Sequence, residues 1–77
     1  MATTQEVAQW MYEELLRDGY LSQERAHYLI IKRFGHRFVQ GDEIDTNVLD
    51  EWQKLTSDKV IWNTPSQVWL LKHRKEK

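Results

Sequence analysis

The chain contains no cysteine, one proline and only three glycines among its 77 residues. Disulfides and thiolate metal sites are therefore excluded, and the absence of thiols suits a reducing cytoplasm. No apolar run approaches the roughly 18 residues of a membrane span, and the N-terminal stretch lacks the basic start and apolar middle of a signal peptide. We expect one cytoplasmic domain over residues 1–77, with no cofactor and no membrane partner, whose charged tail over residues 72–77 frays.

The sequence is rich in aromatic residues, and its charges fall into blocks of one sign. Four Trp, three Tyr and two Phe supply much of the buried area that so small a core requires. The net charge is only −1, but acids dominate residues 1–24 and 42–58 while bases dominate residues 25–37 and 59–77. Such blocks predict either mutually attractive neighbours within the fold or a charged docking face.

Capping residues and apolar periodicity predict three helices. The expected bounds are Thr3 to Gly19, with a capping box closed by Glu6, then Ser22 to Phe34, with Gly35 as its stop, then Asp45 or Thr46 to residues 56–58. Helical spacing places the core on Val7, Ala8, Met11, Tyr12, Leu15 and Leu16, on Ala26, Ile30 and Phe34, and on Val48, Leu49, Trp52 and Leu55. Outside that core, Glu13 and Arg17 are spaced as an i,i+4 ion pair.

Two candidate contact features lie near these helices. Trp10 projects beside the first apolar stripe, so it is either the margin of the core or an exposed contact residue. The acidic turn over residues 41–45 follows an apolar connection over residues 37–40. Its carboxylates do not have the spacing of a calcium loop, and we therefore predict no metal site.

Residues 59–72 predict an antiparallel hairpin at the C-terminal end. Two β-branched and aromatic runs flank a turn that takes its fixed φ from Pro65. With the turn over residues 64–67, Trp62 faces Trp69 and Ile61 faces Leu70. Both faces of the hairpin are then apolar. We expect the chain itself to cover both, the alternative being that the second face is offered to a partner.

The order of these elements resembles the winged-helix superfamily over nearly the whole chain. It comprises a helix, one short strand position at Tyr20 and Leu21, two more helices and a final hairpin. The resemblance implies an α+β fold of three helices followed by a C-terminal two-stranded antiparallel hairpin. It also implies a third helix that enters the DNA major groove, through Asn47, Asp50, Glu51 and Lys54, and a hairpin tip over residues 63–67 that touches the DNA backbone.

The charges disfavour DNA binding in that usual pose. The third helix presents Asp50 and Glu51 against Lys54 alone, and the hairpin tip carries no base, whereas phosphate neutralisation supplies most non-specific affinity. A different pose stays open as the alternative function, a DNA-binding regulator or accessory protein that uses the basic second helix and tail. The nucleic-acid candidates are Arg25, Tyr28, Lys32, Arg33, Arg37, Lys72 and Arg74.

Enzymatic chemistry has no support in the residue pattern. The three histidines stand in unrelated contexts, and three glycines leave no phosphate-cradling loop. We therefore predict a non-enzymatic binding module that meets a protein partner or a second copy through aromatic surface and an acidic third helix. The protein-interaction candidates are Trp10, Trp62, Trp69, Asp50 and Glu51.

Overall fold

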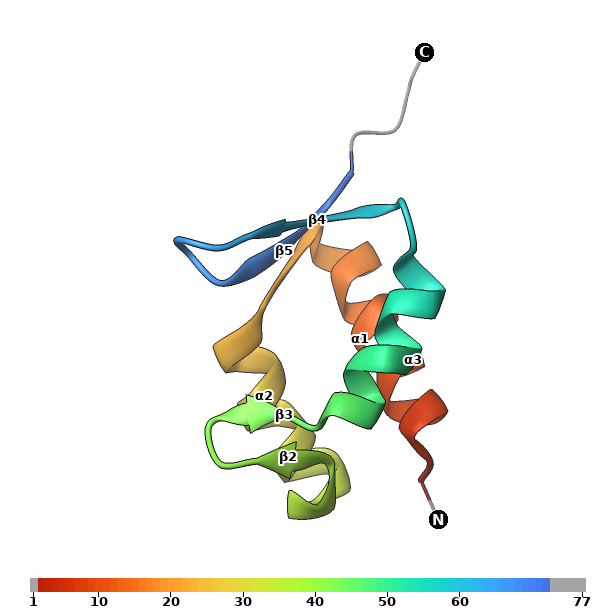
Figure 1. Ribbon diagram of the computed structural model, residues 1–77, viewed down its shortest axis with the longest axis vertical. Coiled ribbons are helices and arrows are strands. Elements are labelled where there is room, and N and C mark those ends of the chain that lie inside the picture. Colours follow the sequence, from red (N-terminus) through yellow and green to blue (C-terminus); the bar gives the residue numbers. More distant parts are fainter. Residues whose placement is uncertain (1, 73–77) are drawn as a thin grey trace.

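The computed structural model describes residues 2–72 (Figure 1). Its elements are α1 (Thr4–Asp18), β1 (Tyr20–Ser22), α2 (Gln23–Phe34), the 3₁₀ turn η1 (His36–Phe38), β2 (Val39–Gln40), β3 (Glu43–Ile44), α3 (Thr46–Thr56), β4 (Val60–Asn63) and β5 (Val68–Leu71). Within this range no helix has the length and apolar character needed to cross a membrane. Residues 73–77 of the tail that was predicted to fray over residues 72–77, and with them the candidate Arg74, lie outside the described residues.

The predicted helix ends are confirmed. The Thr3 hydroxyl accepts from the Glu6 N–H at 3.1 Å while the Glu6 carboxylate accepts from the Thr3 N–H at 2.9 Å, which completes the capping box of α1. Gly19 ends α1 with a φ of 84°, a left-handed conformation that favours glycine. Ser22 caps α2 through the Arg25 N–H, and Asp45 caps α3.

The core lies where the three helices meet beneath the sheet (Figure 1). α1 and α3 pack side by side, and α2 completes the layer. Leu16 was wrongly predicted to lie in the core, because it is 50% exposed. The buried apolar residues are Val7, Ala8, Met11, Leu15, Leu21, Ala26, Ile30, Phe38, Ile44, Val48, Trp52 and Trp69.

The predicted register of the hairpin is confirmed, but the prediction that the sheet has only two strands is wrong. Trp62 pairs with Trp69 and Ile61 with Leu70 across β4 and β5. β1 adds a third strand, so the sheet has the order β1-β5-β4 rather than two strands alone. One strand position was expected at residues 20–21. Between the left-handed Gly19 and the extended Ser22 cap the chain is extended, and this segment, β1, pairs with β5.

Two backbone hydrogen bonds tie the hairpin to the helices at both ends of β5. The Gln23 N–H at the start of α2 donates to the Gln67 carbonyl at 3.0 Å. The Leu71 N–H donates to the Gly19 carbonyl, just after α1, at 3.2 Å. The hairpin is therefore held between the end of one helix and the start of the next.

The two faces of the sheet differ. The inner face, with Trp69, lies on the helices, whereas the outer face carries Tyr20, Leu70 and Ile61 in one row across the three strands. These three side chains are 38–52% exposed. The expectation that the chain covers both faces is therefore wrong. The helices form a single layer, and no element among the described residues crosses the outer face (Figure 1).

The connection between α2 and α3 is more ordered than predicted. It contains η1 and a two-stranded sheet in which Val39 pairs with Ile44. The Asp45 N–H donates to the Phe38 carbonyl at 3.0 Å, and both Phe38 and Ile44 are buried. The acidic turn is thus the tip of a short hairpin whose apolar residues complete the core.

Candidate functional site: an aromatic groove between α3 and the hairpin

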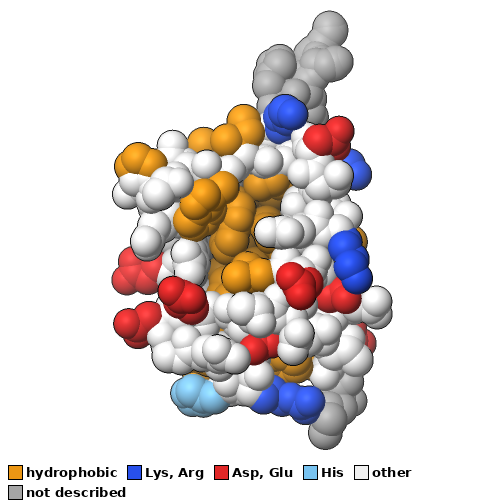
Figure 2. Space-filling model, in the orientation of Figure 1, with side chains coloured by type: hydrophobic (Ala, Val, Ile, Leu, Met, Phe, Trp, Pro, Cys, Tyr) orange, Lys and Arg blue, Asp and Glu red, His pale blue; other side chains and the backbone are white. Residues whose placement is uncertain are grey.

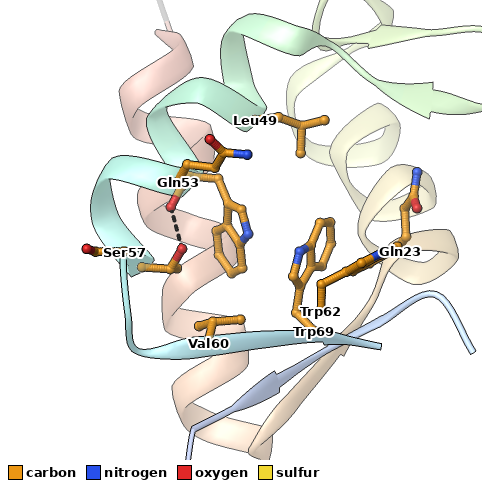
Figure 3. Close-up of a pocket in the computed structure, with 9 residues that line it drawn as sticks. Gln23, Leu49, Gln53, Ser57, Val60, Trp62 and Trp69 are labelled. Atoms are coloured by element: carbon orange, nitrogen blue, oxygen red, sulfur yellow. Dashed lines mark hydrogen bonds between the residues drawn. The ribbon is translucent and has the colours of Figure 1, made fainter. Parts of the chain in front are cut away.

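A groove of about 610 Å³ opens between α3 and the inner face of the hairpin. Figure 2 shows it as a hollow floored by hydrophobic side chains. In Figure 3, Trp69 points from the hairpin toward Leu49, and the Trp62 ring, seen edge-on, extends toward Gln23, with Gln53 on the opposite side. The complete lining is Gln23, Leu49, Trp52, Gln53, Thr56, Ser57, Val60, Trp62 and Trp69.

Tilted indole rings in contact with one another form the wall of this groove. The centroid of the Trp69 ring lies 5.1 Å from that of Trp52 and 4.9 Å from that of Trp62, with interplanar angles of 58° and 50°. Tyr12 of α1 supports Trp52 edge-on at 6.5 Å. Exposure rises along the series from 2% at Trp52 through 8% at Trp69 to 40% at Trp62, which stands on the edge strand. The groove therefore offers one open ring backed by two buried ones.

The indole N–H groups of this wall have no protein acceptor within residues 2–72. Neither Trp52, Trp62 nor Trp69 forms a side-chain hydrogen bond to another described residue. Buried Trp N–H groups usually find an acceptor, since leaving one unpaired costs about 1–3 kcal/mol. The wall therefore presents hydrogen-bond donors to whatever occupies the groove.

The helix side of the groove is polar but uncharged. Thr56 donates from Oγ1 to the Trp52 carbonyl at 2.8 Å (the dashed line in Figure 3), and the Ser57 N–H donates to the Gln53 carbonyl at 2.7 Å. The side-chain amides of Gln23 and Gln53 hold no partner in the described part of the chain. These amides add both donors and acceptors at the two margins of the groove.

Acidic residues flank this uncharged lining. Glu24, Asp50 and Asp58 are exposed and directly follow lining residues in the sequence, as does Lys54, whose ammonium group is paired with Glu51. Figure 2 shows acidic side chains on both sides of the hollow and basic ones toward the margins of this face. Neither of the two predicted acidic candidates lines the groove. Asp50 directly follows the lining residue Leu49, and Glu51, which directly precedes Trp52, is paired with Lys54 at 3.5 Å.

Trp10 belongs to a second aromatic cluster, at the opposite end of the helical layer. It packs edge-on against Phe34, with ring centroids 5.8 Å apart, and Phe34 meets Phe38 at 6.1 Å. The Arg33 guanidinium lies over the Trp10 ring at 5.6 Å. Trp10 is half-buried, so it is the margin of the core rather than an open contact residue.

The structure does not bring the basic candidates together into one surface. Arg25, Tyr28 and Lys32 follow one exposed side of α2, and Lys32 lies 5.7 Å from the centre of the Tyr28 ring. Arg37 instead lies over the Phe38 ring at 5.1 Å. Arg33 is part of the Trp10 cluster, and Lys72 follows β5 at the other end of the molecule.

One ion pair was predicted with the wrong partner. Arg17 contacts Glu14 at 2.6 Å and Asp18 at 3.1 Å rather than Glu13. Its hydrogen bond lowers the pKa of the Asp18 carboxyl, with a smaller contribution from the positive charges of Arg17 and Arg25.

No group of three or more metal-ligating side chains lies together within residues 2–72.

The groove itself was only partly predictable. Trp62 and Trp69 were candidates, but Gln23, Gln53 and Ser57 were not. The available signal was the spacing of Leu49, Gln53 and Thr56 at i, i+4 and i+7 on α3, which places them along one side of the helix, at the edge of its buried stripe.

The fold and this site define a small α+β domain with an open, tryptophan-lined groove. The chain belongs to a family of unknown function, DUF6953, whose family model matches residues 3–71. The matched range includes the whole groove and excludes Lys72 and Arg74. No curated protein and no solved structure matches the chain.

Proposed function

We propose that this domain is a non-enzymatic protein-interaction module that holds a segment of a partner protein in the groove between α3 and the hairpin. The observation that carries the proposal is the open ring of Trp62, 40% exposed, which packs at a tilt against the buried Trp69 beside a cavity of about 610 Å³. Aromatic residues supported by buried neighbours are the side chains on which binding energy concentrates in protein interfaces.

We also propose that the fold is winged-helix-like, with the β4–β5 hairpin as its wing. The order of helices and strands and the sheet order β1-β5-β4 support this assignment. In this fold the groove lies between the third helix and the wing. The site that would otherwise adjoin DNA then serves a protein ligand.

Charge favours a protein over a duplex at this site. The lining contains no ionisable side chain, and Asp50 and Glu51 are the charges that α3 presents beside it, apart from the paired Lys54. A duplex docked on α3 would meet these carboxylates without the Lys and Arg contacts that supply phosphate affinity.

A second candidate function, DNA binding through α2, rests on one observation. Tyr28 is 58% exposed between Arg25 and Lys32 on a single side of the helix. An exposed ring between cations can stack on a base while the cations contact the phosphate backbone. This surface lies on α2, outside the groove, so the two functions are separable by mutation.

Selection from a displayed library of random peptides, about 12 residues long, tests the first proposal. We expect enriched peptides whose binding falls at least about tenfold in Trp62→Ala, because the open ring is lost. Ile61→Ala is the matched control, since Ile61 is also exposed and precedes Trp62 on the same strand but faces the other way. Peptides that bind Trp62→Ala as well as the unmodified chain, or no enrichment at all, would remove the proposal.

A duplex titration at low and moderate salt tests the second candidate. If α2 binds DNA, affinity falls steeply with salt and is lost when Arg25→Glu and Lys32→Glu are combined, while Trp62→Ala changes nothing. Binding that ignores both salt and these charge reversals would exclude it.

A further inference from the structure

We infer that the groove's ligand is a proline-rich segment in the polyproline II conformation, with basic residues beside it. This inference rests on the proposed function, because it names the class of protein segment that the groove holds. It is argued from the rings, the unpaired donors and the charges of the groove.

The rings fit prolines. Trp62 and Trp69 are tilted at 50° with centroids 4.9 Å apart, so they make a notch of flat apolar faces rather than a closed pit. A pyrrolidine ring is short, rigid and apolar, and it packs on such faces without losing side-chain rotamer freedom. The fixed geometry of a polyproline II helix lowers the entropy that a ligand loses on binding.

The unpaired donors fit the carbonyls of such a segment. A polyproline II chain has no internal hydrogen bonds, so its carbonyl oxygens are free to accept. The groove supplies the indole N–H groups of Trp52, Trp62 and Trp69, which have no acceptor in the described part of the chain. A helical ligand would offer them nothing, because its carbonyls are used internally except at its last turn.

Charge complementarity defines the flanks of the ligand. No lining residue is ionisable, so the part of the segment inside the groove is uncharged. Glu24 and Asp50 lie just beyond the lining on two different helices, and acidic side chains border the hollow on both sides (Figure 2). Arg or Lys on either side of the prolines would meet these carboxylates.

Synthetic peptides of about ten residues test this inference. The first alternates proline and leucine and carries one Arg at each end. The second replaces every proline with alanine, and the third replaces both Arg with Glu. Indole N–H resonances report the site directly, since Trp52, Trp62 and Trp69 line the groove while Trp10 lies in the other cluster and serves as an internal reference.

We expect the proline peptide to shift the three groove indoles and leave Trp10 unchanged. The alanine peptide should bind at least about tenfold more weakly, and the Glu peptide more weakly by a smaller factor. Trp69→Phe keeps an aromatic ring but removes one hydrogen-bond donor. This variant should therefore bind the proline peptide more weakly than the unmodified chain while it keeps the native fold. Ile61→Ala should leave the affinity unchanged.

Several results would overturn the inference. Equal binding of the proline and alanine peptides in the groove would exclude polyproline recognition but leave the protein-interaction proposal intact. The same holds if library peptides that depend on Trp62 contain no proline. Shifts of the groove indoles that depend only on protein concentration would make a second copy the occupant. Failure of both the synthetic and the library peptides would remove both proposals.

Discussion

Two clusters of aromatic rings in this small domain have different surroundings. The capped cluster, Trp10, Phe34 and Phe38, joins neighbouring rings at 5.8 and 6.1 Å. The groove cluster, Tyr12, Trp52, Trp69 and Trp62, joins them at 6.5, 5.1 and 4.9 Å. Arginine guanidinium groups lie over all three rings of the capped cluster, whereas no cation lies over a groove ring within residues 2–72.

The difference shows how one residue type serves two purposes in one chain. The cleft beside Trp10 is lined by charged residues, including Glu6, Glu13 and Arg33, and the guanidinium covers the ring face. The face of Trp62 has no such cover and adjoins an uncharged cavity. The two rings therefore differ both in exposure and in what lies over the ring face.

The largest effect is expected where the groove cluster joins the core. Trp52→Ala removes a side chain that is 2% exposed and contacts both Tyr12 and Trp69. We expect the free energy of unfolding to fall by about 3–5 kcal/mol in urea denaturation, because truncation leaves a large cavity. Trp52→Phe should lower the free energy of unfolding by less than half as much as Trp52→Ala. A loss below about 1 kcal/mol for the alanine variant would mean that Trp52 is not part of the core.

The second test sets Trp10 against Trp62. Trp10→Ala should lower the free energy of unfolding by about 1–2 kcal/mol, because a half-buried ring and its contact with Phe34 are lost, and leave groove binding unchanged. Trp62→Ala should destabilise by about 1 kcal/mol or less and abolish groove binding. Denaturation and peptide titration of both variants give the comparison. The same pattern in both variants would contradict the division of roles.

Thr56→Val is a smaller perturbation beneath the groove. The Thr56 hydroxyl donates to the Trp52 carbonyl at 2.8 Å, and the residue is only 4% exposed. Replacing it with a methyl group of the same shape should lower the free energy of unfolding by about 1 kcal/mol. Ser57→Ala, at an exposed neighbour, is the control and should change stability less. An increase in stability for Thr56→Val would show that the hydrogen bond contributes nothing net.

Arg33→Gln should expose the capped cluster with little effect on the fold. The guanidinium lies over both Trp10 and Phe34, and contacts of this kind at exposed sites contribute about 0.5–1 kcal/mol. We expect the indole N–H resonance of Trp10 to broaden more when a soluble paramagnetic agent is added, measured against the indole resonances of Trp52, Trp62 and Trp69 in the same chain. Unchanged broadening would mean that the cation does not shield the ring.

The smallest expected effect lies outside both clusters. Because Arg17 lowers the pKa of Asp18, the carboxylate stabilises the fold above its ordinary pKa of about 4, and that contribution is lost as pH falls through the lowered folded value. The difference in melting temperature between the unmodified chain and Asp18→Asn should therefore exist near neutral pH and vanish in acid. A difference that grows toward acid would have the wrong sign.

Local signals were sufficient for most of the fold. Helix ends followed from Thr3, Ser22 and Gly19, because capping depends on residues three or four positions apart. The hairpin register followed from one turn and two apolar runs. The third strand was missed as a strand because Tyr20 and Leu21 give too short a pattern, and their pairing with β5 depends on residues nearly 50 positions away.

The groove needed the tertiary structure. Sequence spacing identified Trp62 and Trp69 as a pair but could not place α3 across from them, and therefore gave no reason to select Gln23 or Gln53. It also could not show that Trp10 is covered, because Arg33 reaches it from another helix. The outer row of Tyr20, Leu70 and Ile61 was misjudged for the same reason, since nothing local says which layer a sheet face meets.

The hydrogen bonds from Gln23 to Gln67 and from Leu71 to Gly19 have a consequence for the kinetics of binding. Because β5 is held at both ends, the hairpin can swing away as a body only if this backbone pairing breaks, and we therefore expect the groove to keep its width when a ligand binds. A ligand then enters without waiting for a rearrangement of the domain. Association should follow a single step at an ordinary diffusive rate, about 10⁵–10⁷ M⁻¹s⁻¹, and different ligands should differ mainly in how long they stay.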